Sequence, residues 1–154
     1  MQKENILIDW FFSMKIKIRR IYVDTNVLIN YCTSQSKDVQ ALKYVFSKRR
    51  KEVLFTSSLA VVQTISRLQS GNKSRKRKAY SRENTIEKLN DLLQKFTVLD
   101  LSLSDINSGF NLNNSDIEDS IHYVLCQKAK CDAILTNNRI IYEKRQNPLG
   151  RRRN

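Results

Sequence analysis

The sequence predicts an α/β fold of three layers, α/β/α, in which helices cover both faces of a central and mainly parallel sheet. Short apolar runs rich in β-branched residues alternate with longer segments whose apolar residues recur at helical spacing. This alternation is typical of parallel sheets, because each crossover places a helix on one face of the sheet. The 154 residues include only 3 Gly and 1 Pro, so long irregular loops are not expected.

Four short runs are expected to form the strands. Each is apolar and rich in residues that favour an extended backbone, and the first run, Ile21-Tyr22-Val23, leads directly into Asp24. The expected strands are residues 21–23, 53–56, 98–101 and 133–136.

Five segments are expected to form helices. Ser57 or Ser58 can cap the helix that follows the second strand. In the next helix, Ile86 and Leu89 belong to the apolar side that should face the core. The expected helices are residues 25–31, 38–48, 58–69, 82–95 and 115–128.

The chain is expected to hold one domain, over residues 14–142, since 154 residues suit a single core. The segment that begins at Met14, MKIKIRRIYVDTNVL, reads as a short basic lead into the first strand. Residues 1–13 are therefore interpreted as an upstream extension that packs little against the domain. Residues 143–154 end in three arginines and are expected to form a disordered basic tail.

The chain is strongly basic. Lys and Arg together number 28 against 15 Asp and Glu, which gives a net charge of +13. Such a charge favours a polyanionic partner such as nucleic acid, although an ordinary basic surface would have the same composition.

The cysteines and the hydropathy pattern bear on where in the cell the protein is expected to be. Cys32, Cys126 and Cys131 have neither the spacing of a disulfide framework nor that of a zinc site, which indicates thiols in a reduced, cytoplasmic protein. No apolar run approaches the ~18–20 residues that a membrane span needs.

Acidic residues at two positions can bear chemistry. Asp24 follows the first strand, and ligands of open α/β sheets bind beyond the carboxyl ends of strands; Asp24 could equally cap the next helix. Asp116 and Asp119 are three residues apart, so they share one face of a helix. Carboxylates in proximity suit Mg²⁺ or Mn²⁺, while acids at this position also complement the helix dipole.

The start of that acidic helix has a predicted cap. Ser115 is expected at the N-cap, with Ser115 and Glu118 as a capping box that explains Glu118 without a catalytic role. Ile117 and Ile121 are expected to face the core, on the opposite arc from the aspartates. The only histidine, His122, is expected to have a structural or surface place.

Two polar segments remain ambiguous. Thr136-Asn137-Asn138 follows the last expected strand and could orient a metal-bound water, hold a carboxylate or form an ordinary turn. Five basic residues between two helices could follow an RNA backbone by charge alone or could form a solvated loop. They are Lys73, Arg75, Lys76, Arg77 and Lys78.

Three segments in order, VDTNVLINY, TSSLAVVQTISRL and SDIEDSIHYVLCQKAKCDAILTNN, resemble the PIN-domain family, in its branch with a D-x-E-D motif. The likeness covers roughly residues 20–142. PIN domains are typically metal-dependent ribonucleases, and many prokaryotic ones are VapC-like toxins held by an antitoxin. The resemblance therefore implies RNA as the substrate, with an antitoxin protein and a second copy of the chain as further partners.

The resemblance also implies roles for individual residues. Asp24 and Asp119 would be catalytic, and Asp116 and Asn138 would join them in holding Mg²⁺ or Mn²⁺ for attack of water on an RNA phosphodiester. Thr136 and Asn26 would support this site.

Two departures from the family pattern leave an alternative open. Gln63 stands where the family usually has Glu, so it would be a weak or lost metal ligand: its carbonyl can still coordinate, but it brings no charge. In addition, no Asp precedes Tyr142 in the segment TNNRIIY. A catalytically degenerate PIN domain that binds RNA or a protein is therefore the alternative to a nuclease.

Overall fold

The computed structural model describes residues 20–33, 54–71, 73–74, 76–136 and 139–142. The expected helix over residues 38–48, the extension over residues 1–13 and the tail over residues 143–154 lie outside this described part. Within it, no helix is long and apolar enough to cross a membrane.

The described residues form one sheet of five strands in the order β3-β2-β1-β4-β5. The strands are β1 (Ile21–Val23), β2 (Leu54–Ser57), β3 (Thr97–Leu99), β4 (Ala133–Thr136) and β5 (Arg139–Tyr142). The first four are parallel, and β5 adds an antiparallel edge to β4. Because β1 lies between β2 and β4, its carboxyl end is at the middle of the sheet, and the mainly parallel prediction is confirmed.

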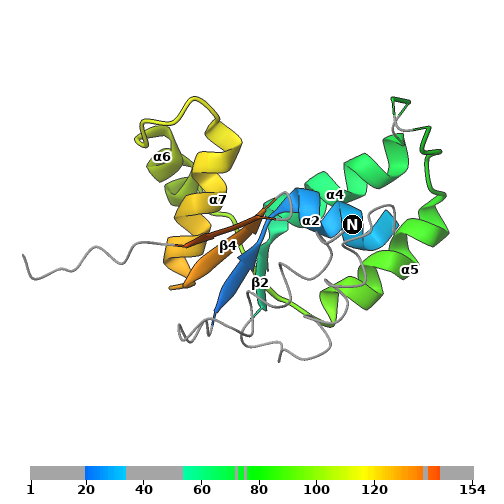
Figure 1. The fold of residues 1–154 in the computed structure, drawn as a ribbon, viewed down its shortest axis with the longest axis horizontal. Coiled ribbons are helices and arrows are strands. Elements are labelled where there is room, and N and C mark those ends of the chain that lie inside the picture. Colours follow the sequence, from blue (N-terminus) through cyan, green and yellow to red (C-terminus); the bar gives the residue numbers. More distant parts are fainter. Residues whose placement is uncertain (1–19, 34–53, 72, 75, 137–138, 143–154) are drawn as a thin grey trace, which may run out of the picture.

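Helices cover both faces, which completes the predicted three layers (Figure 1). The helices α2 (Thr25–Thr33), α4 (Ser58–Ser70) and α5 (Arg82–Leu93) lie on one side of the sheet. The helices α6 (Leu103–Phe110) and α7 (Ile117–Lys128) lie on the other.

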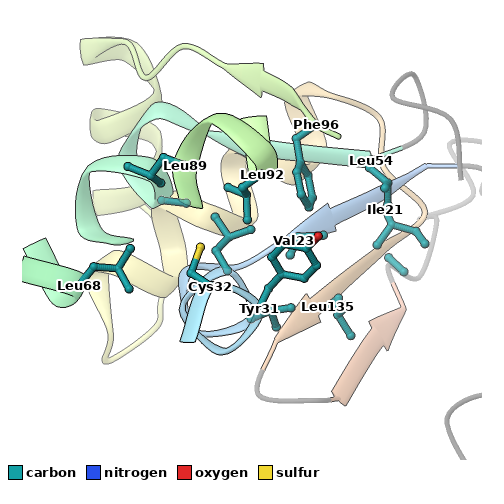
Figure 2. Packing of buried hydrophobic residues seen from close by; sticks show 14 residues of the cluster. Ile21, Val23, Tyr31, Cys32, Leu54, Leu68, Leu89, Leu92, Phe96 and Leu135 are labelled. Atoms are coloured by element: carbon teal, nitrogen blue, oxygen red, sulfur yellow. The ribbon is translucent and has the colours of Figure 1, made fainter. Parts of the chain in front are cut away.

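Alternation along the strands divides the core in two. Ile21 and Val23 of β1 point into the α2–α4–α5 side, where they pack with Leu28 and Leu92 (Figure 2). Tyr22, between them in the sequence, points to the opposite side and packs with residues of α7. Each fully buried Leu or Ile contributes roughly 1.5–3 kcal/mol by leaving water, so both faces are anchored by this pattern.

Two elements were not predicted from the sequence. α6 begins at a capping box, in which Ser102 accepts from the backbone N–H of Asp105 and the Asp105 carboxylate accepts from the backbone N–H of Ser102. The other is β5, which was interpreted only as a divergent motif after β4.

Two predicted core positions were wrong. The side chain of Ile86 is 41% exposed and that of Ile117 is 54% exposed. Ile117 occupies the first position of α7, beyond the edge of the sheet, so the core begins only with the next turn, at Ile121.

Candidate functional site at the carboxyl edge of the sheet

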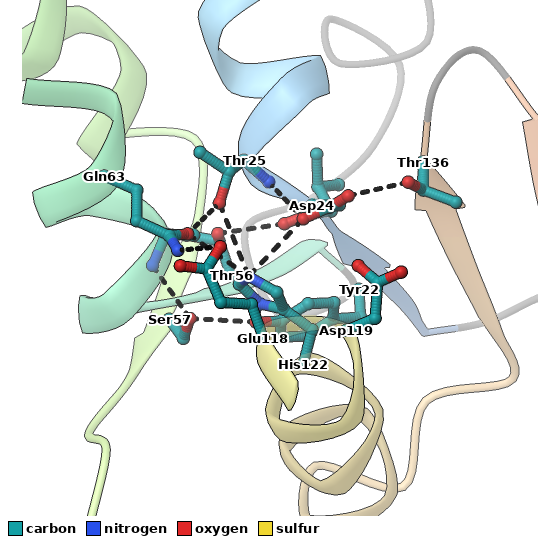
Figure 3. A network of polar contacts seen from close by, with 12 residues as sticks. Tyr22, Asp24, Thr25, Thr56, Ser57, Gln63, Glu118, Asp119, His122 and Thr136 are labelled. Atoms are coloured by element: carbon teal, nitrogen blue, oxygen red, sulfur yellow. Dashed lines mark hydrogen bonds and ion pairs between the residues drawn. The ribbon is translucent and has the colours of Figure 1, made fainter. Parts of the chain in front are cut away.

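Asp24 lies at the centre of the site, immediately after β1 and before α2. Its carboxylate is buried and accepts two hydrogen bonds, from the backbone N–H of Thr25 to Oδ1 and from the hydroxyl of Thr136 to Oδ2, both at 2.6 Å (Figure 3). Its backbone carbonyl accepts from the N–H groups of Val27 and Leu28, so the residue also begins the helix. The carboxylate is therefore held in one orientation.

Two cavities meet at Asp24. The larger, of roughly 500 Å³, lies between α2, α4 and the start of α7, and the smaller, of roughly 390 Å³, lies beside β4 and the end of α6. Asp24, Asp119 and His122 line both cavities. The larger cavity is also lined by Asp116 and Glu118, so acidic side chains from two separate parts of the chain face one space.

The predicted cap of α7 was wrong. Asp116, not Ser115, is the N-cap, and its Oδ1 accepts from the backbone N–H of Asp119 at 3.1 Å. Because the N-cap lies one residue later than predicted, Glu118 has no place in a capping box and instead lines the larger cavity.

The pKa of Asp119 is affected by the acidic side chains that lie near it. Partial burial and the negative charges of Asp116 and Asp24 raise its pKa above the ordinary value of an aspartate. A nearby cation would relieve this repulsion.

Gln63 of α4 extends into the same space. Its amide nitrogen donates to Glu118 Oε2 at 2.9 Å, and its Oε1 accepts from the Thr25 hydroxyl at 2.5 Å. A carboxylate can only accept, so the contact with Glu118 fixes which end of the amide is nitrogen and leaves the carbonyl oxygen towards Thr25 and His122.

His122, which was expected to have a structural or surface place, lines both cavities. It is buried on α7, with Nδ1 2.7 Å from the hydroxyl of Tyr22 and Nε2 3.5 Å from Asp24 Oδ1. Burial lowers the pKa of the imidazole, although Asp24 and Asp119 favour its charged form. One pattern pointed to it: His122 follows Asp119 by three residues and so lies on the same face of α7.

The other residues predicted for the site do not all have a described position there. Asn26 is exposed and lines the larger cavity, and Thr136 contacts Asp24 directly. Asn138 lies outside the described residues. In the described part of the chain, no three His, Cys, Asp or Glu side chains lie together as a metal-binding group.

The basic segment follows α4, away from Asp24 along the helix axis. Lys73, Lys76 and Lys78 are exposed, and Arg75 lies outside the described residues. Arg77 donates to the backbone carbonyl of Arg67 at 2.6 Å, so it holds the segment against the helix. Arg77 therefore has a structural role in addition to any contact with RNA.

Comparison with known proteins places the whole described fold in one family. The family model described as PIN domain matches residues 21–146. Among solved structures, the chain is similar to VapC20 from Mycobacterium tuberculosis, a sarcin–ricin-loop-cleaving toxin, with a TM-score of 0.56 at 12% sequence identity. That match covers 75% of this chain and 88% of VapC20. No curated protein matches the sequence. The extent of the family match shows that the chain belongs to the PIN domain family.

Proposed function

We propose that this chain is a metal-dependent ribonuclease that hydrolyses RNA phosphodiester bonds. The observation on which this depends is the convergence of Asp24, Asp116 and Asp119 on one cavity at the carboxyl edge of the sheet. Membership of the PIN domain family supports the same activity. The basic composition, with a net charge of +13, suits an RNA substrate.

The residues present fit a divalent cation in their chemistry. All three acids offer oxygen atoms, which Mg²⁺ and Mn²⁺ prefer. Burial raises the pKa of Asp119, and the charges of Asp116 and Asp24, which a cation would neutralise, raise it further. Asp24 and Asp119 would hold the ion, with Asp116 and Asn138 as further ligands. When bound, it would polarise a phosphate oxygen and lower the pKa of a coordinated water.

The protein groups around this position have separate tasks. Thr25 and Thr136 hold the Asp24 carboxylate, so it need not reorganise when the ion binds. Arg67 lines the larger cavity from α4 and is placed to meet a phosphate. From Gln63 to the end of α4 at Ser70, seven residues span about 10 Å, so the basic segment beyond lies within reach of adjoining nucleotides.

The similarity to a solved toxin structure bears on the biological role of this chain. The similar structure, VapC20, is a toxin that cleaves the sarcin–ricin loop. We infer that this chain is likewise an RNA-cleaving toxin, held inactive by an antitoxin protein, acting as a homodimer in the cytoplasm. The buried thiols of Cys32, Cys126 and Cys131 agree with a reducing compartment.

One observation favours the alternative, a PIN domain that binds RNA without cutting it. Gln63 contributes an amide where an acid would add charge, and its two ends are already engaged by Thr25 and Glu118. Such a domain would bind RNA with equal affinity in the presence and absence of metal.

An RNA cleavage assay separates the two functions. The chain, freed of metal with EDTA, is incubated with 5′-labelled single-stranded RNA, and Mg²⁺ or Mn²⁺ is added back. The nuclease predicts cleavage that requires the ion and is absent from a parallel preparation of Asp24→Asn. RNA binding without cleavage at saturating Mn²⁺ would establish the alternative.

A further inference from the structure

One nitrogen and two oxygen atoms, each from a different part of the fold, lie close together at the carboxyl edge of the sheet. His122 Nε2, on α7, lies 3.5 Å from Asp24 Oδ1 at the end of β1 and 3.3 Å from Gln63 Oε1 on α4 (Figure 3). Neither Gln63 nor His122 belongs to the acidic set on which the proposed function rests.

The hydroxyl of Tyr22 links His122 to Ser57, at 2.7 Å from His122 Nδ1 and 2.8 Å from Ser57 Oγ. When this hydroxyl donates its only hydrogen to Ser57, it accepts from His122 Nδ1–H. In a neutral imidazole with hydrogen on Nδ1, Nε2 has a lone pair and no hydrogen. That lone pair is directed towards the carboxylate of Asp24 and the carbonyl of Gln63.

In this tautomer, His122 Nε2 faces three oxygen atoms, since Thr25 Oγ1 also lies 3.5 Å from it. The hydrogen of the Thr25 hydroxyl is given to Gln63 Oε1, and the Gln63 amide nitrogen donates to Glu118. In this arrangement no hydrogen lies between Nε2 and either Asp24 Oδ1 or Gln63 Oε1. Lone pairs that face one another repel, and a cation between them would convert the repulsion into coordination.

The two distances from His122 Nε2, to Gln63 Oε1 and to Asp24 Oδ1, are those expected between ligands of one metal ion. Ligand atoms at about 2.1 Å from a metal lie about 3.0–3.5 Å from one another in octahedral or tetrahedral geometry, since the metal–ligand bonds to nitrogen and oxygen are ~2.0–2.2 Å long. The two measured distances, 3.3 and 3.5 Å, fall in that range. A metal-bound histidine also donates its other N–H to a fixed partner, which for His122 in this tautomer is the Tyr22 hydroxyl at 2.7 Å.

We propose that His122 carries its hydrogen on Nδ1, and that its Nε2 forms with Gln63 Oε1 and Asp24 Oδ1 a mixed nitrogen–oxygen metal site that selects Mn²⁺ over Mg²⁺. The inference rests on the proposed function, because it names the ligands and the preference of the same metal centre. Imidazole is a poor ligand for Mg²⁺ and a good one for first-row transition ions, so the nitrogen sets the preference. The neutral amide of Gln63 then serves as a ligand in place of an acid.

The test uses the fact that His122 is the only histidine in the chain. The untagged protein is prepared with ¹⁵N-histidine, loaded with Mn²⁺ and studied by pulsed electron paramagnetic resonance. A directly bound imidazole predicts a nitrogen coupling that changes from the ¹⁴N to the ¹⁵N pattern on labelling. Any such coupling comes from His122, so no substitution that could disturb the fold is needed.

Three variants extend the test by titration with Mn²⁺ and with Mg²⁺. His122→Gln should raise the Mn²⁺ Kd by more than about tenfold, and Tyr22→Phe by about tenfold, as outer-shell changes typically do. Their Mg²⁺ Kd should change far less. Tyr31→Phe removes the hydroxyl of another buried tyrosine, which donates to Asp91 outside the site, and should leave both constants unchanged.

The outcomes separate this inference from the proposed function. Mn²⁺ bound with a histidine nitrogen coupling, and held more tightly than Mg²⁺, supports both. Mn²⁺ bound without that coupling, or equal affinity for the two ions, overturns the role of His122 while leaving a metal-dependent nuclease intact. Failure of either ion to bind overturns both.

Discussion

The hydroxyl of Thr136 donates a 2.6 Å hydrogen bond to Oδ2 of Asp24, from the last residue of β4 to the first residue beyond β1. The two strands are parallel neighbours, and Val23 pairs with Leu135 in their register. The positions that follow this pair are therefore side by side at the carboxyl edge of the sheet. Strand pairing alone brings together residues 112 apart in the sequence.

Thr136→Val removes this hydrogen bond and keeps the shape of the side chain. Because a buried carboxylate then lacks one donor, the free energy of unfolding should fall by about 1–3 kcal/mol without metal. The RNA cleavage rate should fall as well, since the carboxylate is less well held. Urea unfolding and single-turnover cleavage measure the two effects.

Thr64→Val is the matched control, because the buried Thr64 hydroxyl donates to the backbone carbonyl of Ala60. It should lower stability and spare the rate. Equal loss of rate in both variants would show that Thr136 acts through general stability alone.

Gln63→Glu should make stability more dependent on metal. Without metal, the new carboxylate would face Glu118 at the position where the amide now donates at 2.9 Å, a repulsion on the order of 1 kcal/mol at an exposed pair. With Mn²⁺, the added charge should strengthen binding and raise the melting temperature further than in the parent.

The comparison is a thermal melt in EDTA and in Mn²⁺, with Gln69→Glu as control. Gln69 is an exposed glutamine of the same helix, outside the residues that line either cavity. If the two variants respond alike to Mn²⁺, position 63 does not contact the ion.

Removing positive charge after α4 should weaken RNA binding and its salt dependence. The test variant changes the exposed Lys73 and Lys78 to Ala, and Lys76, whose φ is 52°, to Asn, which tolerates a positive φ. It should reduce the slope of log K against log salt by up to about 2, at ~0.7 per phosphate contact on a single strand. Fluorescence anisotropy at several salt concentrations gives this slope.

Lys130→Asn serves as the control for charge. Lys130 is exposed, precedes β4 and so lies at the opposite edge of the sheet, and its positive φ of 53° is one that Asn tolerates. It should leave the slope unchanged. An unaltered slope in the triple variant would exclude this segment from the RNA-binding surface.

Asp105 should contribute stability that disappears in acid. Although burial alone would raise its pKa, hydrogen bonds from Lys128 and Ser102 lower it below the ordinary aspartate value. A lowered folded-state pKa gives stability that is present above the unfolded value of about 3.9 and is lost as pH falls through the folded value.

Asp105→Asn should therefore be less stable than the parent by about 1 kcal/mol at pH 7, since Lys128 is partly exposed. The difference in the free energy of unfolding between Asp105→Asn and the parent should become smaller as the pH falls below about 4. Urea unfolding from pH 3 to 7 tests this, with Glu87→Gln, a change at an exposed acid of α5, as reference. A difference that is constant with pH would rule out the charge of Asp105 as its source.

Strong periodicity explains which parts of the fold the sequence predicted. The strand over residues 133–136 was predicted with the bounds it has, and α4 differs from its prediction by one residue at its C-terminus. Both carry an apolar pattern reinforced by a cap or a turn. α6 was not predicted because its eight residues are mostly small or polar, and its helix depends on the Ser102–Asp105 box and on packing against α7.

Prediction of the site from the sequence was limited in a similar way. Strand ends and acidic spacing could place Asp24, Asp116 and Asp119 near one another, because backbone topology decides their positions. His122 could not be singled out, since a lone histidine on a helix is most often structural, and its importance depends on Tyr22 and Gln63 from distant segments. The engagement of Glu118 by Gln63 likewise depends on how α4 and α7 approach each other.

The most direct test of a metal-dependent nuclease is the single-turnover rate of RNA cleavage for the parent and Asp24→Asn, at saturating RNA and Mn²⁺. The substitution keeps the size of the buried side chain and one oxygen that can accept from the backbone N–H of Thr25. It removes the charge and the second acceptor, which now accepts from Thr136. We predict a loss of more than about 100-fold, beyond the range of changes to outer-shell groups, in a variant that still unfolds cooperatively. Equal rates for the two proteins would contradict the assignment of Asp24 and, with it, the nuclease at this site.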